Sequence, residues 1–414
     1  MSRVRVLGLG ITLAVLGLVP VAFSSSAAVA ATPRNVYTPV LAQLLSPNNP
    51  APVLGTDREN HVLYELRLSN RGPIPATIQQ VTVVDADTRL PVHTYSGDDL
   101  LERVRDTGGV AAPDAVIEPG GERLFLVDLS FDLSANVPLV LEHRLDLLAA
   151  KSPRATQPTA VSYTILPISV DGPAPPVLVA PVRGNGWVVT DGCCNVGSAD
   201  RGTILPVNGG LWSPLRYNVD LMQLDDNGLF VHDDPTQLTN FTSYGADVLA
   251  VAPGRVAAVV DALPDQPVGG SPDAGGSGFE SAGGNYIVID LGNGSYAYYG
   301  NLQPGSLLVK PGDRVQRRQV LATIGNSGDS VYPHLEFRLM SSPSPFGSDG
   351  LPFVLNGFSY EGNVDVVRFV TDGVFGNYLD NRQATPIPRR RELPLALAIV
   401  DFGAAGGAGA AGRT

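Results

Sequence analysis

Hydrophobic and polar residues alternate with a period of two over much of this chain, a pattern that predicts strands with one buried face. The clearest run lies between residues 284 and 340, where the alternating stretches 286–289 and 296–299 flank Asn293 and Gly294. Asn-Gly is the strongest short signal for a two-residue hairpin turn. The region therefore predicts consecutive antiparallel strands.

The first half of the chain, residues 35–172, shows the same pattern in short stretches separated by turn residues. This spacing predicts a β-sandwich of immunoglobulin-like shape, although the Cys and Trp marks of true immunoglobulin domains are missing. A Pro-rich run and the Gly184–Gly186 turn predict a linker over residues 173–186. The fold class predicted for the whole chain is all-β.

Both ends of the chain differ in composition from the middle. Two arginines precede an apolar run over residues 6–23, and small residues follow it, so residues 1–31 are predicted to be a signal peptide. No second run reaches the length of a membrane span, which predicts an exported protein of the periplasm, cell envelope or extracellular space. Residues 359–402 are predicted to be a polar, strand-poor extension, and residues 403–414 a disordered Gly/Ala tail.

The formal net charge is −12, and 16% of the residues are charged. This balance argues against a nucleic-acid partner, because such proteins use clusters of Lys and Arg. The two cysteines, Cys193 and Cys194, are adjacent. They form either a vicinal disulfide or a pair of small buried thiols, and the absence of a C-x-x-C arrangement disfavours a redox role.

The order of landmarks between residues 284 and 337 resembles the lysostaphin/LytM-type zinc endopeptidases, which cut peptide cross-links of bacterial cell walls. The landmarks are Gly284-Asn285, the Y-x-x-L stretch 299–302, the G-x-x-V region 309–319, the G-x-x-G turn 325–328, and 334–337 in place of H-L-H-F. The resemblance implies a LytM-type antiparallel β-sheet core, similar to a barrel-sandwich hybrid, over residues 187–358. It also implies a zinc cofactor.

In that family, zinc is held by an H-x-x-x-D segment and by the second histidine of H-L-H. The resemblance places Asp220 at the aspartate position, and Arg216 stands four residues earlier where the first histidine belongs. An alternative alignment puts Asp200 at that first position. Glu336 replaces the third ligand, so all three metal ligands implied here, Asp200, Asp220 and Glu336, are carboxylates.

Two further histidines of the family assist the bound water. One position holds Asn301, whose amide exchanges no proton near neutral pH and so cannot act as a general acid or base. His334 keeps the other position, and it lies two residues before Glu336, which places both side chains on one strand face. Arg216 and Tyr299 are expected to line the groove.

Two interpretations follow from these substitutions. Either the carboxylates form an oxygen-rich metal site, or Arg216 neutralises Asp220 and Glu336 through ion pairs and no metal is needed. The second interpretation predicts a catalytically degenerate homologue that binds cell-wall peptidoglycan or regulates an envelope hydrolase. The alternative is an active metallo-endopeptidase of peptidoglycan peptides with unusual ligands.

Overall fold

A computed structural model describes residues 35–46, 49–270 and 279–403. The predicted signal peptide and all but the first residue of the predicted tail lie outside these ranges. The regular structure of the described residues consists of mostly antiparallel strands and a few short helices, so the prediction of an all-β chain is confirmed. No helix in the described ranges is long and apolar enough to cross a membrane.

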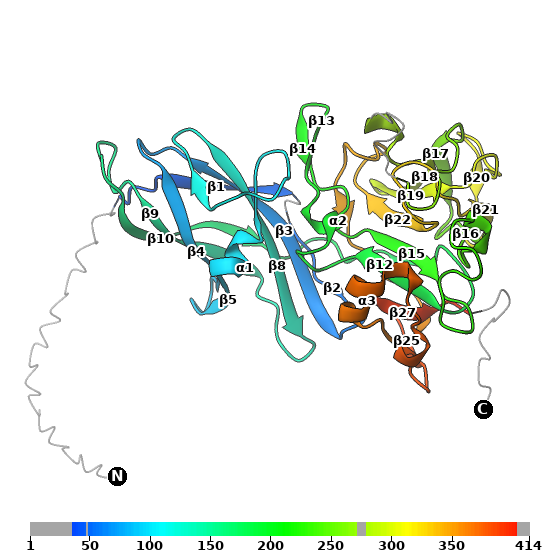
Figure 1. Ribbon diagram of the computed structural model, residues 1–414. Coiled ribbons are helices and arrows are strands. Elements are labelled where there is room, and N and C mark those ends of the chain that lie inside the picture. Colours follow the sequence, from blue (N-terminus) through cyan, green and yellow to red (C-terminus); the bar gives the residue numbers. More distant parts are fainter. Residues whose placement is uncertain (1–34, 47–48, 271–278, 404–414) are drawn as a thin grey trace, which may run out of the picture. The chain divides into compact units, whose positions relative to one another are not determined.

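The first half of the chain forms two antiparallel sheets, drawn in blue to teal in Figure 1. One sheet has the order β1-β3-β8-β6, with β2 beside β3: β1 (Val40–Ser46), β2 (Val53–Leu54), β3 (Glu59–Asn70), β6 (Val104–Arg105) and β8 (Glu122–Asp132). The other has the order β10-β9-β4-β5, with β7 beside β4: β4 (Ala76–Asp85), β5 (Pro91–Ser96), β7 (Val116–Ile117), β9 (Val140–Ala149) and β10 (Thr159–Ser169). Helix α1 (Gly97–Leu101) follows β5.

Alternation explains how these sheets pack. On β9, for example, Leu141, His143, Leu145 and Leu147 are buried, while Glu142, Arg144 and Asp146 between them are more exposed. They join Tyr64 and Val127 of the other sheet in one hydrophobic cluster. The two sheets therefore share a core, as a β-sandwich does, and the immunoglobulin-like shape stays a prediction.

The second half is built on an eleven-stranded sheet of order β20-β17-β18-β19-β22-β15-β12-β27-β25-β26, with β23 beside β22. Its strands are β12 (Trp187–Gly192), β15 (Val219–Gln223), β17 (Gly254–Val260), β18 (Asn285–Gly292), β19 (Ser295–Leu302), β20 (Arg314–Val315), β22 (Leu335–Met340), β23 (Gly350–Leu351), β25 (Phe358–Asn363), β26 (Ile387–Arg389) and β27 (Ala398–Asp401). The predicted hairpin joins β18 to β19, with positive φ at both Asn293 and Gly294.

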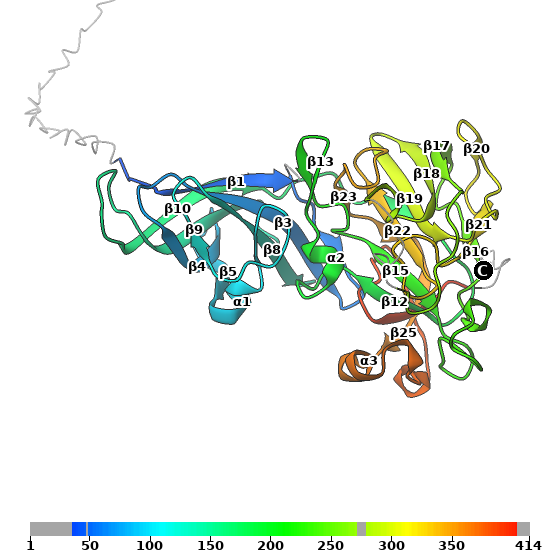
Figure 2. The same ribbon diagram turned by 45° about the horizontal axis from the view of Figure 1, so that its top comes forward.

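Three strand pairs and several short helices complete this half. The pairs are β11 (Val177–Leu178) with β24 (Val354–Leu355), β13 (Leu205–Val207) with β14 (Gly210–Trp212), and β16 (Asp247–Leu249) with β21 (Val320–Thr323). The helices are α2 (Ala199–Gly202), α3 (Val366–Asp372), η1 (Leu238–Asn240), η3 (Phe279–Ser281), η4 (Gly373–Phe375) and η5 (Leu379–Asn381). Figure 2 shows α2 close to β12 and β15, as in Figure 1.

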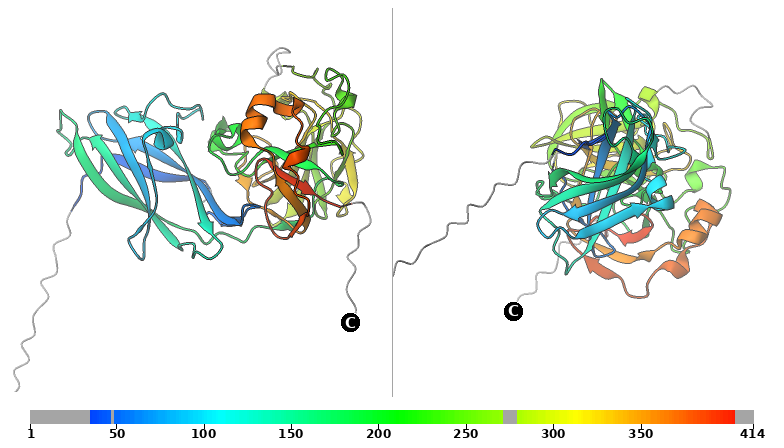
Figure 3. Two further views of the ribbon diagram at one scale, coloured as in Figure 1. Left: turned by 60° about the horizontal axis from the view of Figure 1, so that its bottom comes forward. Right: turned by 90° about the vertical axis from the view of Figure 1, so that its left-hand side faces the viewer.

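The prediction of a strand-poor segment after Phe358 is wrong. Strands β25, β26 and β27 all belong to the large sheet, and β27 lies between β12 and β25. Figure 3 shows this orange and red part of the chain as strands and the short helix α3. Ala398, Ile399 and Val400 are fully buried. The short apolar run in which they lie indicates a strand, but the prediction followed the polar composition of the segment around it.

Candidate functional site

The register of the large sheet brings the expected site residues together. On β22, Leu335, Phe337 and Leu339 belong to the main hydrophobic core, so Glu336 points to the opposite face. The neighbouring strand β15 places Asp220 directly opposite Glu336. Two carboxylates thus lie side by side on one face of the sheet, where like charges repel.

Asp200 lies beside Asp220, as the alternative alignment expected. The amide nitrogen Nδ2 of Asn218 donates to Asp200 Oδ2 over 2.7 Å and to Asp220 Oδ1 over 2.9 Å. Asp200 is held there by α2, whose N-cap residue Ser198 accepts a hydrogen bond on its hydroxyl from the backbone N–H of Arg201. A single neutral donor therefore joins two acidic side chains.

A third aspartate, Asp191, adds negative charge to the same place. It stands opposite Asp220 in the register of β12 with β15, and it accepts a hydrogen bond from Ser198 Oγ. Burial and the charge of Asp191 raise the pKa of Asp220 to about 7. Burial and the charges of Asp220 and Asp191 raise the pKa of Asp200 well above its usual range. We call Asp191, Asp200, Asp220, Glu336 and Arg338 the acidic cluster.

His334 faces this cluster through one ring nitrogen. Its Nδ1 lies 2.8 Å from the carbonyl oxygen of Tyr332, so the Nδ1–H donates there in the neutral ring. Its Nε2 stands 3.9 Å from Asp220 Oδ2, beyond hydrogen-bond distance. Burial lowers the pKa of His334, which favours the neutral ring.

Arg338 is the residue that sequence reasoning missed. It is fully buried, it follows Glu336 by two residues on the same strand face, and its Nη1 donates to Glu336 Oε1. The guanidinium carbon lies 3.9 Å from the centre of the Tyr298 ring, and Nη2 donates to the carbonyl oxygen of Pro345. The signal was present, because the spacing that relates His334 to Glu336 continues to Arg338.

Asn301 lies at the end of β19 with a positive φ of 57° and is 1% exposed. Its Nδ2 donates to the carbonyl oxygen of Ser327 over 2.9 Å. Its Oδ1 is buried without a hydrogen-bond partner among the described residues. The side chain is thus fixed by the backbone and supplies no proton-transfer group.

The expected ion pairs of Arg216 are wrong. Arg216 is 1% exposed, and its Nε and Nη2 donate to the two carboxylate oxygens of Glu65, on β3 of the sandwich. Arg201 Nη1 donates to the same carboxylate over 2.6 Å, and Arg201 Nε donates to Asp128. The prediction considered only the second half of the chain, whereas the partner lies in the first. We call Glu65, Asp128, Arg201 and Arg216 the buried ion network.

The prediction that Tyr299 lines the groove is also wrong. The register pairs it with Phe337, and the two rings lie 5.3 Å apart inside the main core. Its hydroxyl accepts a hydrogen bond from the backbone N–H of Val251. The tyrosine on the face of Glu336 and Arg338 is instead Tyr298, which the register of β19 with β22 places opposite Arg338.

Cys193 and Cys194 form a vicinal disulfide, which decides between the two alternatives left open by the sequence. Cys193 is 1% exposed and belongs to the main core. The bond lies directly after β12, between Asp191 of the acidic cluster and Arg201 of the buried ion network.

The donor set does not fit a zinc ion. Zinc in such sites needs about three close protein ligands. Among residues 35–46, 49–270 and 279–403, no group of three His, Cys, Asp or Glu side chains is arranged to hold a metal. The Asn218 amide bridges Asp200 and Asp220, and Arg338 binds Glu336, so the ligand positions are already engaged with N–H donors.

Comparison with known proteins gave one family match, in which the profile of peptidase family M23 matches residues 238–347. The match includes Asn301, His334 and Glu336 but not Asp200 or Asp220. No match was found among curated proteins.

Several solved structures are similar to this chain. The catalytic domain of lysostaphin from Staphylococcus simulans is 20% identical, over 40% of this chain and 88% of that chain, with a TM-score of 0.24. The catalytic domain of the prophage-encoded M23 protein EnpA from Enterococcus faecalis is 17% identical over 44% and 95%, with a TM-score of 0.25. A SpoIIQ–SpoIIIAH pore-forming complex contains a chain 15% identical over 43% and 89%, with a TM-score of 0.26.

Proposed function

Because residues 238–347 form a domain of peptidase family M23, we propose that this protein is a catalytically degenerate member of that family. It acts as an exported binding or regulatory module of the cell envelope. Its partner is cell-wall peptidoglycan or a hydrolase that acts on it. No bond cleavage by this chain is required for such a role.

The ion pair between Glu336 and Arg338 carries this proposal. By the resemblance, Glu336 stands where the family has its third zinc ligand, and the buried guanidinium of Arg338 binds its carboxylate. A fixed cation at this place repels a second cation, because Coulomb interactions are strong where water is excluded. Zinc would have to break this pair and leave Arg338 buried without a counterion, which is costly.

The remaining assisting groups support the same conclusion. Peptide hydrolysis needs a group that transfers protons to and from the attacking water and the leaving amine. Asn301 supplies none, and the His334 ring is held by its Nδ1–H on the carbonyl of Tyr332. His334 alone cannot replace the electrophile that the family chemistry uses.

Three measurements on the purified protein test the proposal. After exposure to zinc and removal of the excess, elemental analysis should find far less than one metal per chain. Incubation with cell walls should release no peptide fragments, under conditions in which lysostaphin releases them from its own substrate. The protein should nevertheless bind sedimented cell-wall material or an envelope hydrolase saturably.

The variant His334→Ala distinguishes binding from chemistry. It should leave the metal content unchanged, because no bound metal depends on His334. One zinc per chain, together with cell-wall cleavage that His334→Ala abolishes, would overturn the proposal and favour an active metallo-endopeptidase with oxygen-rich ligands. A folded protein that binds neither cell walls nor a hydrolase would contradict the binding role.

A further inference from the structure

A cavity of about 820 Å³ lies on the face of the large sheet that also carries Glu336 and Arg338. Val260 of β17 and Tyr286 of β18, which are paired in the sheet, form its floor. The ring of Tyr286 lies 5.5 Å from the ring of Tyr298, the tyrosine opposite Arg338. The volume of the cavity lies within the range of small-molecule sites.

The walls of the cavity come from four separate parts of the chain. They are the loop 262–263 after β17, the helix η3, the loop 344–346 after β22, and residues 207–208 at the tip of the β13–β14 hairpin. Arg338 links this cavity to the acidic cluster, because its Nη1 donates to Glu336 Oε1 and its Nη2 donates to the carbonyl oxygen of Pro345 over 3.0 Å. The cavity is thus a neighbour of the cluster and has a lining of its own.

Three aromatic rings line the cavity, those of Phe279, Tyr286 and Phe346. The rings of Phe279 and Phe346 lie 4.9 Å apart. Phe279 is 50% exposed, so a large apolar side chain of the lining faces water. A ligand that covers this ring removes apolar surface from water, which is favourable.

The described lining carries no formal charge. No Asp, Glu, Lys, Arg or His is among the described residues that line the cavity, and its polar side chains are those of Asn208, Ser281 and Ser344. Asn208 is exposed, and its amide can both donate and accept hydrogen bonds. The acidic cluster nearby would repel an anion, and a cation would find no counterion in the lining. A neutral ligand with hydroxyl groups therefore fits this lining best.

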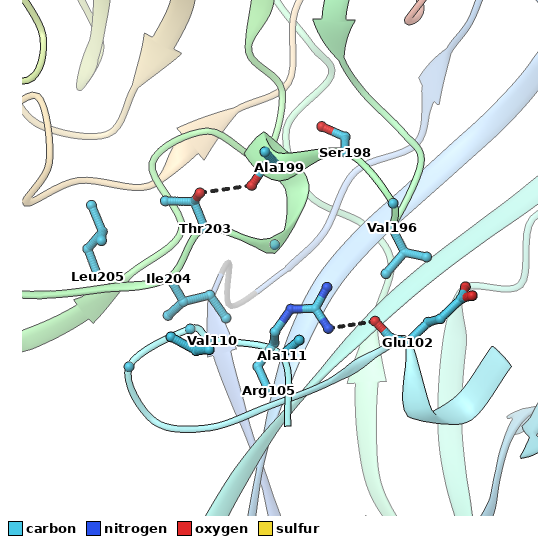
Figure 4. A pocket seen from close by; sticks show the side chains of 14 residues that line it. Glu102, Arg105, Val110, Ala111, Val196, Ser198, Ala199, Thr203, Ile204 and Leu205 are labelled. Atoms are coloured by element: carbon cyan, nitrogen blue, oxygen red, sulfur yellow. Dashed lines mark hydrogen bonds between the residues drawn. The ribbon is translucent and has the colours of Figure 1, made fainter. Parts of the chain in front are cut away.

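A second cavity, of about 560 Å³, lies between the loop 106–111 and the segment 196–205 (Figure 4). Arg105 lines it, and its Nη1 donates to the carbonyl oxygen of Glu102, the bond drawn as a dashed line. A Cβ atom on Gly202 would lie 3.2 Å from both Nε and Nη2 of Arg105, so the backbone of Gly202 already covers that edge. This second cavity therefore offers a ligand neither an open guanidinium edge nor, among its described lining residues, an aromatic ring.

We propose that the 820 Å³ cavity binds a short stretch of a neutral sugar chain, with sugar rings packed against Phe279 and Tyr286. A sugar ring presents mainly C–H groups on its faces, and these groups pack against the faces of aromatic rings. The hydroxyl groups at its edge form hydrogen bonds with Asn208 and Ser344. An apolar side chain of a protein partner would contact the aromatic rings but leave these polar groups unused. The inference rests on the proposed binding role for the source of the sugar, which is the glycan strand of the cell wall.

A ligand-observed NMR titration of the full chain tests the proposal with three neutral compounds. The trimer of N-acetylglucosamine represents the cell-wall glycan, cellotriose a sugar chain without acetamido groups, and N-acetyl-phenylalaninamide an apolar side chain. The acetylated trimer should bind saturably, and the phenylalanine amide should bind about tenfold more weakly or not at all. Stronger binding of cellotriose would support the sugar site but overturn the cell wall as its source. Saturable binding of the phenylalanine amide alone, or of none of the three, would overturn the proposal.

Variants locate the site. Phe279→Ala should weaken sugar binding about tenfold, because it removes the most exposed ring of the lining. Asn208→Gly should weaken it about threefold, since glycine keeps the positive φ of 50° and removes only the amide group. Phe375→Ala, which removes a phenylalanine 55% exposed outside the cavity, should change nothing. Full sugar binding by Phe279→Ala would overturn the proposal. Should a variant not fold, as judged by circular dichroism, the comparison of the three compounds on the native protein still decides.

Sedimentation with cell walls separates this inference from the proposed function. Phe279→Ala should sediment with cell walls more weakly than the native protein. If both bind cell walls equally and neither binds the trimer, the binding role stands and the sugar site is wrong. If the native protein binds the trimer but not cell walls, the sugar site stands and the proposed role at the cell wall is wrong.

Discussion

The buried ion network and the acidic cluster meet in the short helix α2, where Asp200 of the cluster precedes Arg201 of the network, yet the two groups balance charge differently. In the network, two carboxylates meet two guanidinium groups, and Glu65, Arg201 and Arg216 have fully buried side chains. In the acidic cluster, four carboxylates meet the single guanidinium of Arg338. The first arrangement is electrically balanced and the second is not.

The two groups of residues also differ in the direction of their pKa shifts. Arg201 and Arg216 lower the pKa of Glu65 although burial alone would raise it, so the network favours its charged state. In the acidic cluster, burial and neighbouring negative charge raise the pKa of Asp220 and Asp200. Groups held at a cost in stability are typical of sites that meet a ligand, whereas paired groups fix the fold.

The largest effect is expected from Glu65→Gln. This change removes the charge that faces both Arg201 and Arg216, and breaking a buried ion pair from one side costs about 3–5 kcal/mol. The free energy of unfolding, measured by urea denaturation at pH 7, should fall by that amount. The matched control is Glu142→Gln, which breaks a more exposed pair with Arg89 and should cost about 1 kcal/mol or less. Equal losses in both variants would show that the network contributes no more than a surface pair.

Asp220→Asn should have the opposite sign and stabilise the protein by about 1–3 kcal/mol at pH 8. The folded-state pKa of about 7 lies above the ordinary value of 3.8. Between these values the native state holds a proton that the unfolded state has released. The stabilisation that comes from protonated Asp220 is therefore fully present below about pH 4 and is lost as the pH rises through 7. Asp220→Asn has no carboxyl group at this position, so its free energy of unfolding does not fall with pH for this reason.

Urea denaturation at several pH values checks this prediction. The advantage of Asp220→Asn over the native protein should grow from pH 5 to pH 8. Asp87→Asn, which changes an exposed aspartate of the sandwich, should show no such growth. If Asp220→Asn destabilises the protein at every pH, the acidic cluster is not strained and its contrast with the network disappears.

The sequence predicted more of the fold than of the site. Period-two alternation and the Asn293-Gly294 turn identified the hairpin β18–β19, and the spacing of His334 and Glu336 put both on the side of Asp220. These are local properties, which a strand transmits directly to its faces. The three strands after Phe358 were missed because two of them are short and lie in a polar segment.

The partners of charged residues could not be predicted in the same way. Glu65 and Arg216 are 151 positions apart, and nothing in either local pattern connects them. Arg338 was different, since counting alternate positions from Glu336 along β22 would have put it on the site face. Tyr299 lies on β19, and only the register of β19 with β22 sets it opposite Phe337 of the core. Contacts between residues on different strands thus required the folded chain. The face of a residue within one strand required only that alternate positions be counted.

A double-mutant cycle measures how far Arg338 offsets the acidic cluster. Arg338→Gln should destabilise the native protein, because Glu336 loses its buried partner. In the background of Asp220→Asn the same change should cost about 1 kcal/mol less, since Arg338 also attracts Asp220. Urea denaturation of the four proteins at pH 7 gives the coupling energy. A coupling energy of zero would mean that Arg338 stabilises the carboxylate of Glu336 and has no effect on Asp220.

The smallest effect is expected at the bond that lies between the two clusters. The Cys193–Cys194 disulfide joins adjacent residues and closes no loop of the unfolded chain, so the usual entropic stabilisation is absent. Reduction with a phosphine should therefore change the free energy of unfolding by only about 0.5 kcal/mol. A loss as large as that of Glu65→Gln would show instead that the bond holds the segment 191–201 in place. The contrast between the clusters would then depend on the disulfide as well as on their charges.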